Sequence, residues 1–451
     1  MSAWPNRRHA WFAVGVLTLA NTLSFADRQV MALLLEPIKS DLKLSDTRMS
    51  LLHGLGFVAL YALVSLPVAR LADLFNRRTV VAVAVLTLSF TTALCSVARS
   101  FTSLLTARIG VGASEGAFGP AAQSILSDYL PPQRLALALG FFSAGVYVGG
   151  GVALLLGGWL YSFASSLGAV TLPFAGSLYG WRLVLTTLCI PGCFVTLLCL
   201  SIHEPARRQG YFPLPSTRVD MSLAAVWQQL LRQKRVYGGV LCGFCLMIMV
   251  GAGTSTWIPA FFVRRHHWTL MEIGFRYGTI VLVSGSAGVL CGGLCAATLR
   301  QRGLIDANLR VCLFGFTALI PFSVAYPLVS NGWSALWLLA GYNFFAGLPF
   351  GGGYAAILEI TPNRMRAQVM ALFALLVNCV GQGAGPTIIA LLTDYVFRDD
   401  RALAKSLALT ALIVSPLAAA CLWYGRTHYR SASAAVATTT PASSQRPIER
   451  R

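Results

Sequence analysis

Four charged residues within apolar segments are the most informative feature of the sequence. Asp27 and Arg28 lie near the end of one apolar run, and Arg108 and Glu115 interrupt another. Arg108 and Glu115 are seven positions apart, so on a helix they share one face, roughly 10 Å apart along the axis. A charge inside a membrane span is costly unless it faces a partner or water. These residues therefore either carry a function or hold neighbouring helices together.

Two acids and two arginines at matching depth can neutralise one another. Burial favours the neutral form of a carboxylic acid, whereas a nearby arginine favours the carboxylate, so such a site is poised to exchange a proton. A proton on Glu115 would release an arginine to another partner, which constitutes a switch. His53, early in the next apolar run, is a candidate accessory proton carrier, or alternatively a hydrogen-bonded packing residue.

The composition identifies the class of protein that must position these residues. Of 451 residues, 56% are hydrophobic and 11% are charged, whereas soluble proteins carry about 25% charged residues. Each membrane-spanning helix needs about 20 apolar residues, so the chain has room for about a dozen. The net charge of +19 raises the question of nucleic-acid binding, but the basic residues are placed in the loops of a membrane protein.

Apolar runs predict an all-α polytopic membrane protein with twelve transmembrane helices, because an open sheet edge cannot lie in lipid. The expected spans are 10–35, 49–70, 79–98, 102–128, 135–160, 182–202, 237–262, 273–298, 310–328, 333–358, 366–394 and 403–425. They form two pseudo-symmetric six-helix bundles. The expected divisions are an N-terminal bundle (1–202), a cytoplasmic linker (203–235), a C-terminal bundle (236–430) and a disordered cytoplasmic tail (431–451).

Loop charges predict the orientation. With the N-terminus in the cytoplasm, most Lys and Arg residues fall in cytoplasmic segments, which favours both termini inside. Arg264, Arg265 and Arg276 depart from this bias, because they fall outside. Within the linker, Met221–Leu231 is a candidate amphipathic helix for the cytoplasmic surface.

The two halves repeat a local pattern. Pro132-Gln133-Arg134 precedes the fifth span and Pro362-Asn363-Arg364 precedes the eleventh, and both enter glycine-rich helices. Two six-helix halves with a weak internal repeat are typical of an alternating-access transporter.

The loop after the second span reads Ala69-Arg70-Leu71-Ala72-Asp73, followed by Arg77-Arg78. This stretch resembles the signature of the major facilitator superfamily, which is Gly-x-Leu-Ala-Asp followed by basic residues, with Ala69 in place of the first Gly. Asp73 would pair with basic residues when the cytoplasmic side closes, or would alternatively be a solvated carboxylate. The candidate gate residues are Arg70, Asp73, Arg77, Arg78, Asp128, Arg134, Glu359, Arg364 and Arg366. Asp128 is expected near Arg134, and Glu359 near Arg364 and Arg366.

Further stretches resemble the Spinster-like branch of that superfamily, in its bacterial type. They are Phe25-Ala26-Asp27-Arg28-Gln29, Leu34-Leu35-Glu36-Pro37-Ile38, Leu44-Ser45-Asp46, the segment from Arg108 to Pro120, and Gly180-Trp181-Arg182. The resemblance implies proton-coupled transport of a lysolipid- or sphingoid-type amphiphile in the bacterial inner membrane. It also implies that Asp27, Arg28, Arg108 and Glu115 form the coupling site. The organic-anion symporter branch of the superfamily has a similar Asp-Arg pair in its first helix and a similar Glu in its fourth. A small organic anion is therefore the alternative substrate.

The C-terminal half supplies candidate substrate contacts. Aromatic and amide side chains suit a ligand with an apolar body and a polar head. They are Trp257, Tyr342, Asn343, Phe344, Phe345, Asn378 and Gln382. The same residues also suit ordinary helix packing.

Other classes of function fit the sequence poorly. It contains no phosphate-binding Gly-rich loop and no His-x-x-x-His pair, so neither nucleotide hydrolysis nor metal catalysis is indicated. The eleven cysteines fall in the expected spans and suit packing. We therefore expect a monomeric secondary transporter, not an enzyme, that uses a proton gradient and no cofactor or metal. A passive channel is the remaining alternative.

Overall fold

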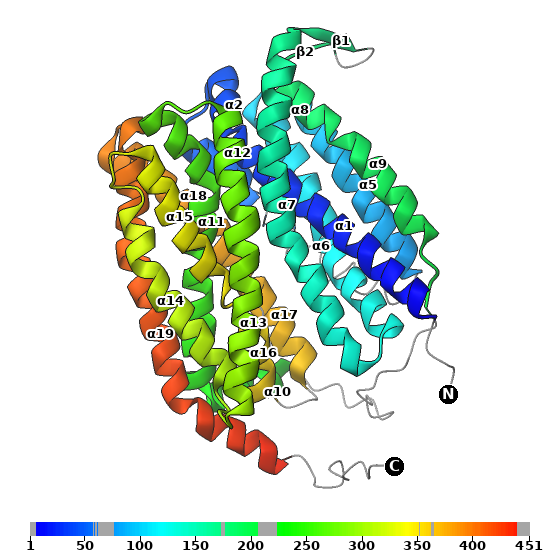
Figure 1. Cartoon of the computed structure of the whole chain (residues 1–451), viewed down its shortest axis with the longest axis vertical. Helices are drawn as coiled ribbons and strands as arrows, with labels where there is room; N and C mark the ends of the chain where they lie inside the picture. Colours follow the sequence, from blue (N-terminus) through cyan, green and yellow to red (C-terminus); the bar gives the residue numbers. More distant parts are fainter. Residues whose placement is uncertain are drawn as a thin grey trace.

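The computed structural model describes residues 6–56, 58, 61, 76–172, 176–205, 223–350, 352–361 and 365–439. Over these residues the chain is almost entirely helical, with one short hairpin (Figure 1). The N-terminal half contains α1 (Arg7–Leu33), α2 (Leu35–Leu42), α3 (Asp46–His53), α5 (Arg77–Ser96), α6 (Phe101–Tyr129), α7 (Pro132–Leu167), β1 (Val170–Leu172), β2 (Gly176–Leu178), α8 (Trp181–Thr187) and α9 (Cys189–Ser201).

The C-terminal half follows α10 (Leu223–Arg232), which confirms the short helix expected in the linker. Three of its elements, η1, η3 and η4, are π-helical turns: η1 and η3 each join two α-helices end to end, whereas η4 follows α18 and ends at Phe397. In chain order it contains α11 (Lys234–His266), α12 (Leu270–Ile280), η1 (Val281–Gly285), α13 (Ser286–Gln301), α14 (Ala307–Ala325), α15 (Gly332–Gly347), α16 (Gly352–Ile360), α17 (Arg366–Leu376), η3 (Val377–Gln382), α18 (Gly383–Leu391), η4 (Leu392–Phe397), η5 (Asp400–Ala402) and α19 (Leu403–Thr439).

Most of the twelve expected spans correspond to helices of the described chain. Within the described residues, nine helical stretches are long and apolar enough to cross a membrane. The other three predicted spans differ for visible reasons. Span 49–70 is described only in part, α6 carries Arg108 and Glu115, and span 333–358 is divided between α15 and α16. The protein is a polytopic integral membrane protein.

The C-terminal tail differs from its prediction over its first part. A disordered segment was expected from residue 431, but α19 continues to Thr439. The extra turns are rich in alanine, which has the highest helix propensity. Residues 440–451 lie outside the described part of the chain.

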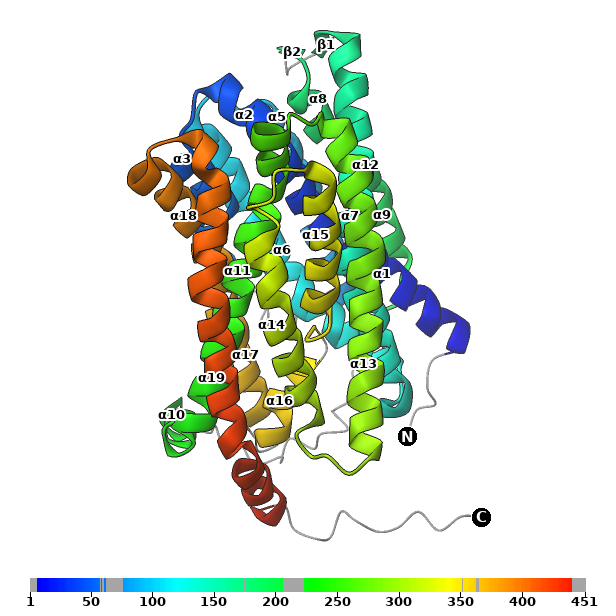
Figure 2. The same ribbon diagram turned by 60° about the vertical axis from the view of Figure 1, so that its left-hand side comes forward.

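The start of α1 and the end of α19 point toward the same end of the molecule, which we call the terminal end (Figures 1 and 2). The opposite end, which holds α2 and the β1–β2 hairpin, is called the distal end. The two halves stand side by side, and α7 of the first packs against α12 of the second. Gly158 and Gly274 allow this close approach, because a Cβ on Gly158 would lie 2.5 Å from the carbonyl oxygen of Leu270.

The helix that carries Arg108 and Glu115 is well defined by its sequence. Ser100 caps the N-terminus of α6, and its side chain and that of Ser103 form a reciprocal capping box. Small residues dominate the following turns, and α5 packs closely along this helix. Glu115 consequently lies at the middle of a long buried helix and not in a loop.

Candidate functional site

Two helices bring the four predicted charged residues together. α1 supplies Asp27 and Arg28, and α6 supplies Arg108 and Glu115. Asp27, Arg108 and Glu115 are buried, with 4%, 1% and 5% of their surfaces exposed. Charges at this depth require partners, because burying an isolated ion costs several kcal/mol or more.

The first ion pair joins Asp27 to Arg108. Arg108 Nη1 lies 2.7 Å from Asp27 Oδ2, and the hydroxyl of Thr92 on α5 donates to Asp27 Oδ1 at 2.6 Å. Three helices of the N-terminal half therefore meet at this carboxylate. A small cavity adjoins Asp27 and is lined by Leu23, Ser89, Thr92 and neighbouring leucines.

The second ion pair joins Arg28 to Glu115. Arg28 Nε donates to Glu115 Oε1 at 3.1 Å, and its Nη2 group contacts Oε2 of the same carboxylate. The fork of the guanidinium matches the two carboxylate oxygens, which is the strongest arrangement for such a pair. Its remaining Nη1 group donates to the amide oxygen of Gln382 on η3, at 2.6 Å. Arg28 consequently contacts both halves of the molecule.

This arrangement can couple protonation to a conformational change. Protonating Glu115 removes the negative charge that holds Arg28, and leaves Arg28 with Gln382 or with an anionic ligand. Arg28 is the most accessible member of the four, with 19% of its side chain exposed. By contrast, Asp27 and Arg108 are both buried and pair within the N-terminal half. This pair is suited to holding α1 and α6 in a fixed arrangement.

His53 lies beside this site, at the end of α3. Its Nδ1 atom is 3.2 Å from the carbonyl oxygen of Met49, and Arg108 and Asp27 both act on it electrostatically. The contact with Met49 fits the interpretation of His53 as a hydrogen-bonded packing residue. The nearby charges fit its interpretation as an accessory proton carrier. His53 therefore remains a candidate proton carrier.

Three predicted gate residues of the N-terminal half, Arg77, Arg78 and Asp128, come together at the terminal end. Asp128 was expected near Arg134 but pairs with Arg77, at 2.5 Å, and Arg134 is exposed. Arg77 also contacts Glu204 at 2.9 Å, and the backbone N–H of Arg78 donates to the same carboxylate. Arg77 is the first residue of α5, and this position at the helix end allows its side chain to turn toward Asp128 on α6. Arg70 and Asp73 lie outside the described residues.

Glu359 likewise has a partner that the sequence did not suggest. It pairs with Arg300 and accepts hydrogen bonds from Asn308 and Tyr429, at 2.8 and 2.7 Å. The expected neighbours cannot be compared, because Arg364 and the side chain of Arg366 fall outside what the structure describes. All of these contacts lie within the C-terminal half, where α13, α14 and α19 converge on Glu359.

The predicted substrate contacts divide into four groups. Gln382 reaches the charged site, whereas Asn343 and Asn378 donate back to carbonyl oxygens of their own helices, at 2.8 Å each. Trp257 is fully buried and donates to the carbonyl oxygen of Pro386, which is a packing contact.

The remaining three are aromatic. Tyr342 is buried against Tyr326, and Phe344 contacts Phe345 edge to face, with ring centroids 5.3 Å apart. Phe345 also meets Phe314 and Phe322, which makes an aromatic cluster in this half.

Sequence reasoning missed several contacts of the site. Thr92 gives no signal, because a threonine in an apolar helix is common. A second set of charges, at the distal end, was also missed: it includes Asp46 and Arg264, which lie far apart in the sequence. Arg264 was visible only as a departure from the loop-charge bias.

The sequence matches the family model of the Major Facilitator Superfamily over residues 17–386. It is 30% identical to an MFS-type efflux pump of Mycolicibacterium smegmatis, over 94% of both chains. It is 22% identical to the sphingosine-1-phosphate transporter SPNS2 of Danio rerio, over 85% of this chain and 76% of the relative. It is also 23% identical to a probable galactarate/D-glucarate transporter of Bacillus subtilis, over 80% and 81%.

A solved structure is similar to the whole architecture. It is the crystal structure of a bacterial homologue of the human lysosomal transporter Spinster, in an inward-facing and unoccupied conformation. The identity is 25% and the TM-score 0.73, over 96% of this chain and 99% of the other.

Proposed function

The chain belongs to the Major Facilitator Superfamily, and we propose that it is a proton-coupled, alternating-access transporter of a lysolipid- or sphingoid-type amphiphile. The family and the fold are those of membrane transporters and not of enzymes. The observation that carries the proposal is the contact of Arg28 with Glu115 in one half and Gln382 in the other.

Proton coupling follows from the competition for Arg28. When Glu115 is ionised it holds the guanidinium, and when Glu115 is protonated the guanidinium is available to a phosphate or carboxylate head group of the substrate. Asp27 and Arg108 stay paired throughout and keep α1, α5 and α6 in register. A proton and a substrate would thus act on one switch, which is what energetic coupling requires.

The amphiphile is favoured over a small organic anion by the chemistry of the C-terminal half. Among its described residues, no basic side chain lies deep in the bundle. The amides of Asn343 and Asn378 are engaged with backbone, so little remains to bind a second anionic group. The aromatic cluster around Phe345 suits an acyl chain.

We also propose the orientation and the gates. Both termini would face the cytoplasm of a bacterial cell, so the distal end would face outward across the inner membrane. The cytoplasmic gate would lie at the terminal end and would include Arg77, Asp128 and Glu359, together with Asp73 and its basic neighbours. One chain supplies both contacts of Arg28, so the transport unit would be a monomer.

Uptake by purified protein in proteoliposomes tests the proposal. An imposed proton gradient should drive accumulation of a labelled lysophospholipid or sphingoid phosphate above its equilibrium level. Equilibration without accumulation would indicate a passive channel, and accumulation of galactarate alone would indicate an organic-anion symporter.

A further inference from the structure

A network of six charged residues joins the two halves at the distal end. The N-terminal half supplies Glu36 and Lys39 from α2 and Asp46 from the start of α3. The C-terminal half supplies Arg264 from the end of α11, Asp394 from η4 and Asp400 from η5. We call these six residues the distal network. In the described part of the chain, every ion pair between the halves belongs to it.

Arg264 makes the largest share of the contacts. Its Nη1 and Nη2 groups lie 2.6 and 2.7 Å from the two oxygens of Asp46, and its Nε group lies 2.6 Å from Glu36 Oε1. Asp46 is fully buried by this arrangement. A residue of the C-terminal half is therefore held by two acids of the N-terminal half.

Lys39 makes the reciprocal contact. Its Nζ lies 2.6 Å from Asp400 Oδ2 in the opposite half and 2.7 Å from Asp46 Oδ1 in its own. Each half thus gives one cation to acids of the other. A third contact across the interface comes from Asp394, which accepts from the backbone N–H and the hydroxyl of Thr47, at 2.8 and 2.6 Å. Asp394 thereby caps the N-terminus of α3 from outside its own half.

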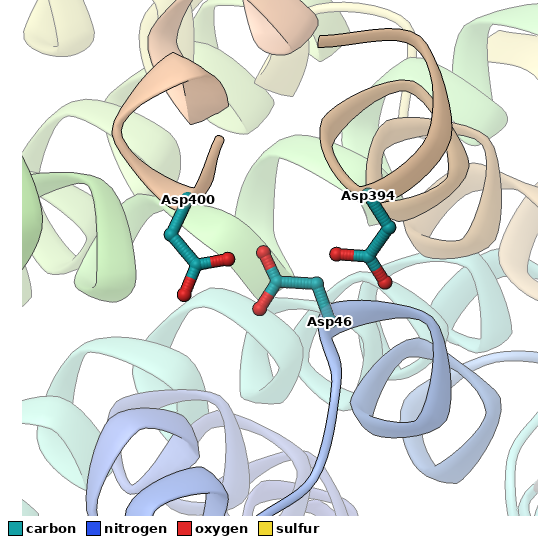
Figure 3. A group of neighbouring side chains, drawn as sticks. All are labelled: Asp46, Asp394 and Asp400. Carbon is teal, nitrogen blue, oxygen red and sulfur yellow. The ribbon is translucent and has the colours of Figure 1, made fainter. Parts of the chain in front are cut away.

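The three aspartates point toward one another, with Asp46 between the other two (Figure 3). Each places an oxygen within 4.8 Å of the others, which is close enough for a metal ion. However, Arg264 and Lys39 already supply two cations to Asp46. The geometry is therefore that of an ion-pair network across an interface.

We propose that the distal network is a latch that opens by exchange of partners. When the halves separate, Lys39 keeps its contact with Asp46, and Arg264 turns to Asp400. The second step is short, because Arg264 Nη1 already lies 3.3 Å from the backbone carbonyl oxygen of Asp400. In the open state, Lys39 and Arg264 would each still have one acidic partner, so neither charge would be left uncompensated.

The charge of each face makes the latch two-state. In the distal network, the surface of the N-terminal half carries Glu36, Lys39 and Asp46, which sum to a net charge of −1. The facing surface of the C-terminal half carries Arg264, Asp394 and Asp400, which also sum to −1. The closed arrangement places opposite charges in contact, whereas faces that have exchanged partners repel each other. Intermediate separations are disfavoured, and the end is either sealed or open.

This inference rests on the alternating access in the proposed function, but not on its substrate or its proton coupling. The experiment measures the distance between spin labels at exposed Ser40 on α2 and exposed Lys405 on α19, both substituted by cysteine in a background without the native cysteines. Arg264→Ala should raise the ratio of open to closed molecules about tenfold, a typical size for such coupling. Arg265→Ala is the matched control, because Arg265 contacts only Leu328 within its own half among the described residues.

Two further variants separate partner exchange from a simple latch. Asp46→Asn removes two ion pairs from the closed state, those with Arg264 and Lys39, but only the pair with Lys39 from the open state, so it should favour the open form. Asp400→Asn removes one contact from each state, so its shift should be clearly smaller. An equal shift in both variants would overturn partner exchange, and no shift for Arg264→Ala would overturn the latch itself.

If Arg264→Ala does not fold, Arg264→Lys replaces it in the same distance measurement. It keeps the charge but cannot bridge Glu36 and Asp46 with a planar fork, so the open population should still rise. No rise would contradict the latch. Because the measurement needs neither substrate nor gradient, its failure would leave the transport assay of the proposed function unaffected.

Discussion

Arg28 Nη1 on α1 lies 2.6 Å from the amide oxygen of Gln382 on η3. The same guanidinium pairs with Glu115 at the middle of α6. A single side chain therefore bonds to an acid in one half and to an amide in the other half. The π-helical form of η3 is consistent with a functional position, because such turns are frequent at functional sites.

The first prediction concerns coupling at Glu115. Glu115→Gln mimics the protonated acid, so the protein should fold and still bind substrate. Accumulation driven by a proton gradient should fall to the passive level, and its pH dependence should disappear. Uptake into proteoliposomes over a range of pH measures both effects.

Glu272→Gln is the control for that substitution, because Glu272 is a partly exposed carboxylate in the capping box of α12, where it pairs with Arg276 of the same helix. Glutamine also serves in a capping box. The control should behave as the wild type. Full gradient-driven uptake with an unchanged pH profile in Glu115→Gln would make Glu115 a structural residue.

The second prediction concerns the bond between the halves. Gln382→Ala removes a hydrogen bond to a charged group, worth about 1.5–3 kcal/mol. Turnover should fall about tenfold, and the pH midpoint of transport should move, because Arg28 then interacts more with Glu115. Asn378→Ala on the same η3 turn should have little effect, since Asn378 bonds to its own helix. Equal effects of the two variants would argue against the link.

The sequence was sufficient to find the four charged residues that pair at the candidate site. Asp27, Arg28, Arg108 and Glu115 stand out because charges within apolar helices are rare and costly. Their pairing could not be read from the sequence. Whether Asp27 pairs with Arg108 or with another cation depends on the rotation of α1 against α6, which many small packing contacts determine together.

The distal network was hidden for a different reason. In the sequence, Lys39 and Asp400 lie in expected loops between spans. Charged residues are too common in loops to indicate a particular contact. Their contact depends on how the two halves meet. The short α10 helix and most spans were predictable, because their periodicity and apolar length are local properties.

The third prediction compares the two buried ion pairs. Asp27→Ala leaves Arg108 buried without its carboxylate, and breaking such a pair costs about 3–5 kcal/mol. Glu115→Ala should cost less, because Arg28 keeps Gln382 and is partly exposed. Thermal unfolding in detergent should therefore show a larger loss for Asp27→Ala. Asp27→Ala combined with Arg108→Ala should recover part of the loss, and no recovery would contradict direct pairing.

The fourth prediction concerns pH at the distal end. Burial alone would raise the pKa of Asp46, but its contacts with Arg264 and Lys39 outweigh burial and lower the pKa below the ordinary value of 3.8. Glu36, Asp394 and Asp400 are the other charged groups around it. A lowered pKa means that the ionised, paired form stabilises the closed state above the ordinary pKa, and that this stabilisation is lost as pH falls through the lowered value.

The distal seal should thus stay closed between pH 8 and pH 5, whereas transport should vary with pH over that range. The label distance between Ser40 and Lys405 measures the seal, and uptake measures transport. Opening of the distal end near pH 6 would place the proton switch in the distal network and not at Glu115.

The last prediction concerns the substrate. Lysophospholipids or phosphorylated sphingoid bases should raise the thermal unfolding temperature in a saturable way, whereas galactarate should not. The head group would bind Arg28, and the chain would lie on the aromatic cluster around Phe345. Arg28→Ala should abolish the stabilisation by anionic amphiphiles. Arg99→Ala, an exposed control just before α6, should preserve it. Saturable stabilisation by galactarate alone would show that the site binds a small organic anion, and that the aromatic residues serve packing only.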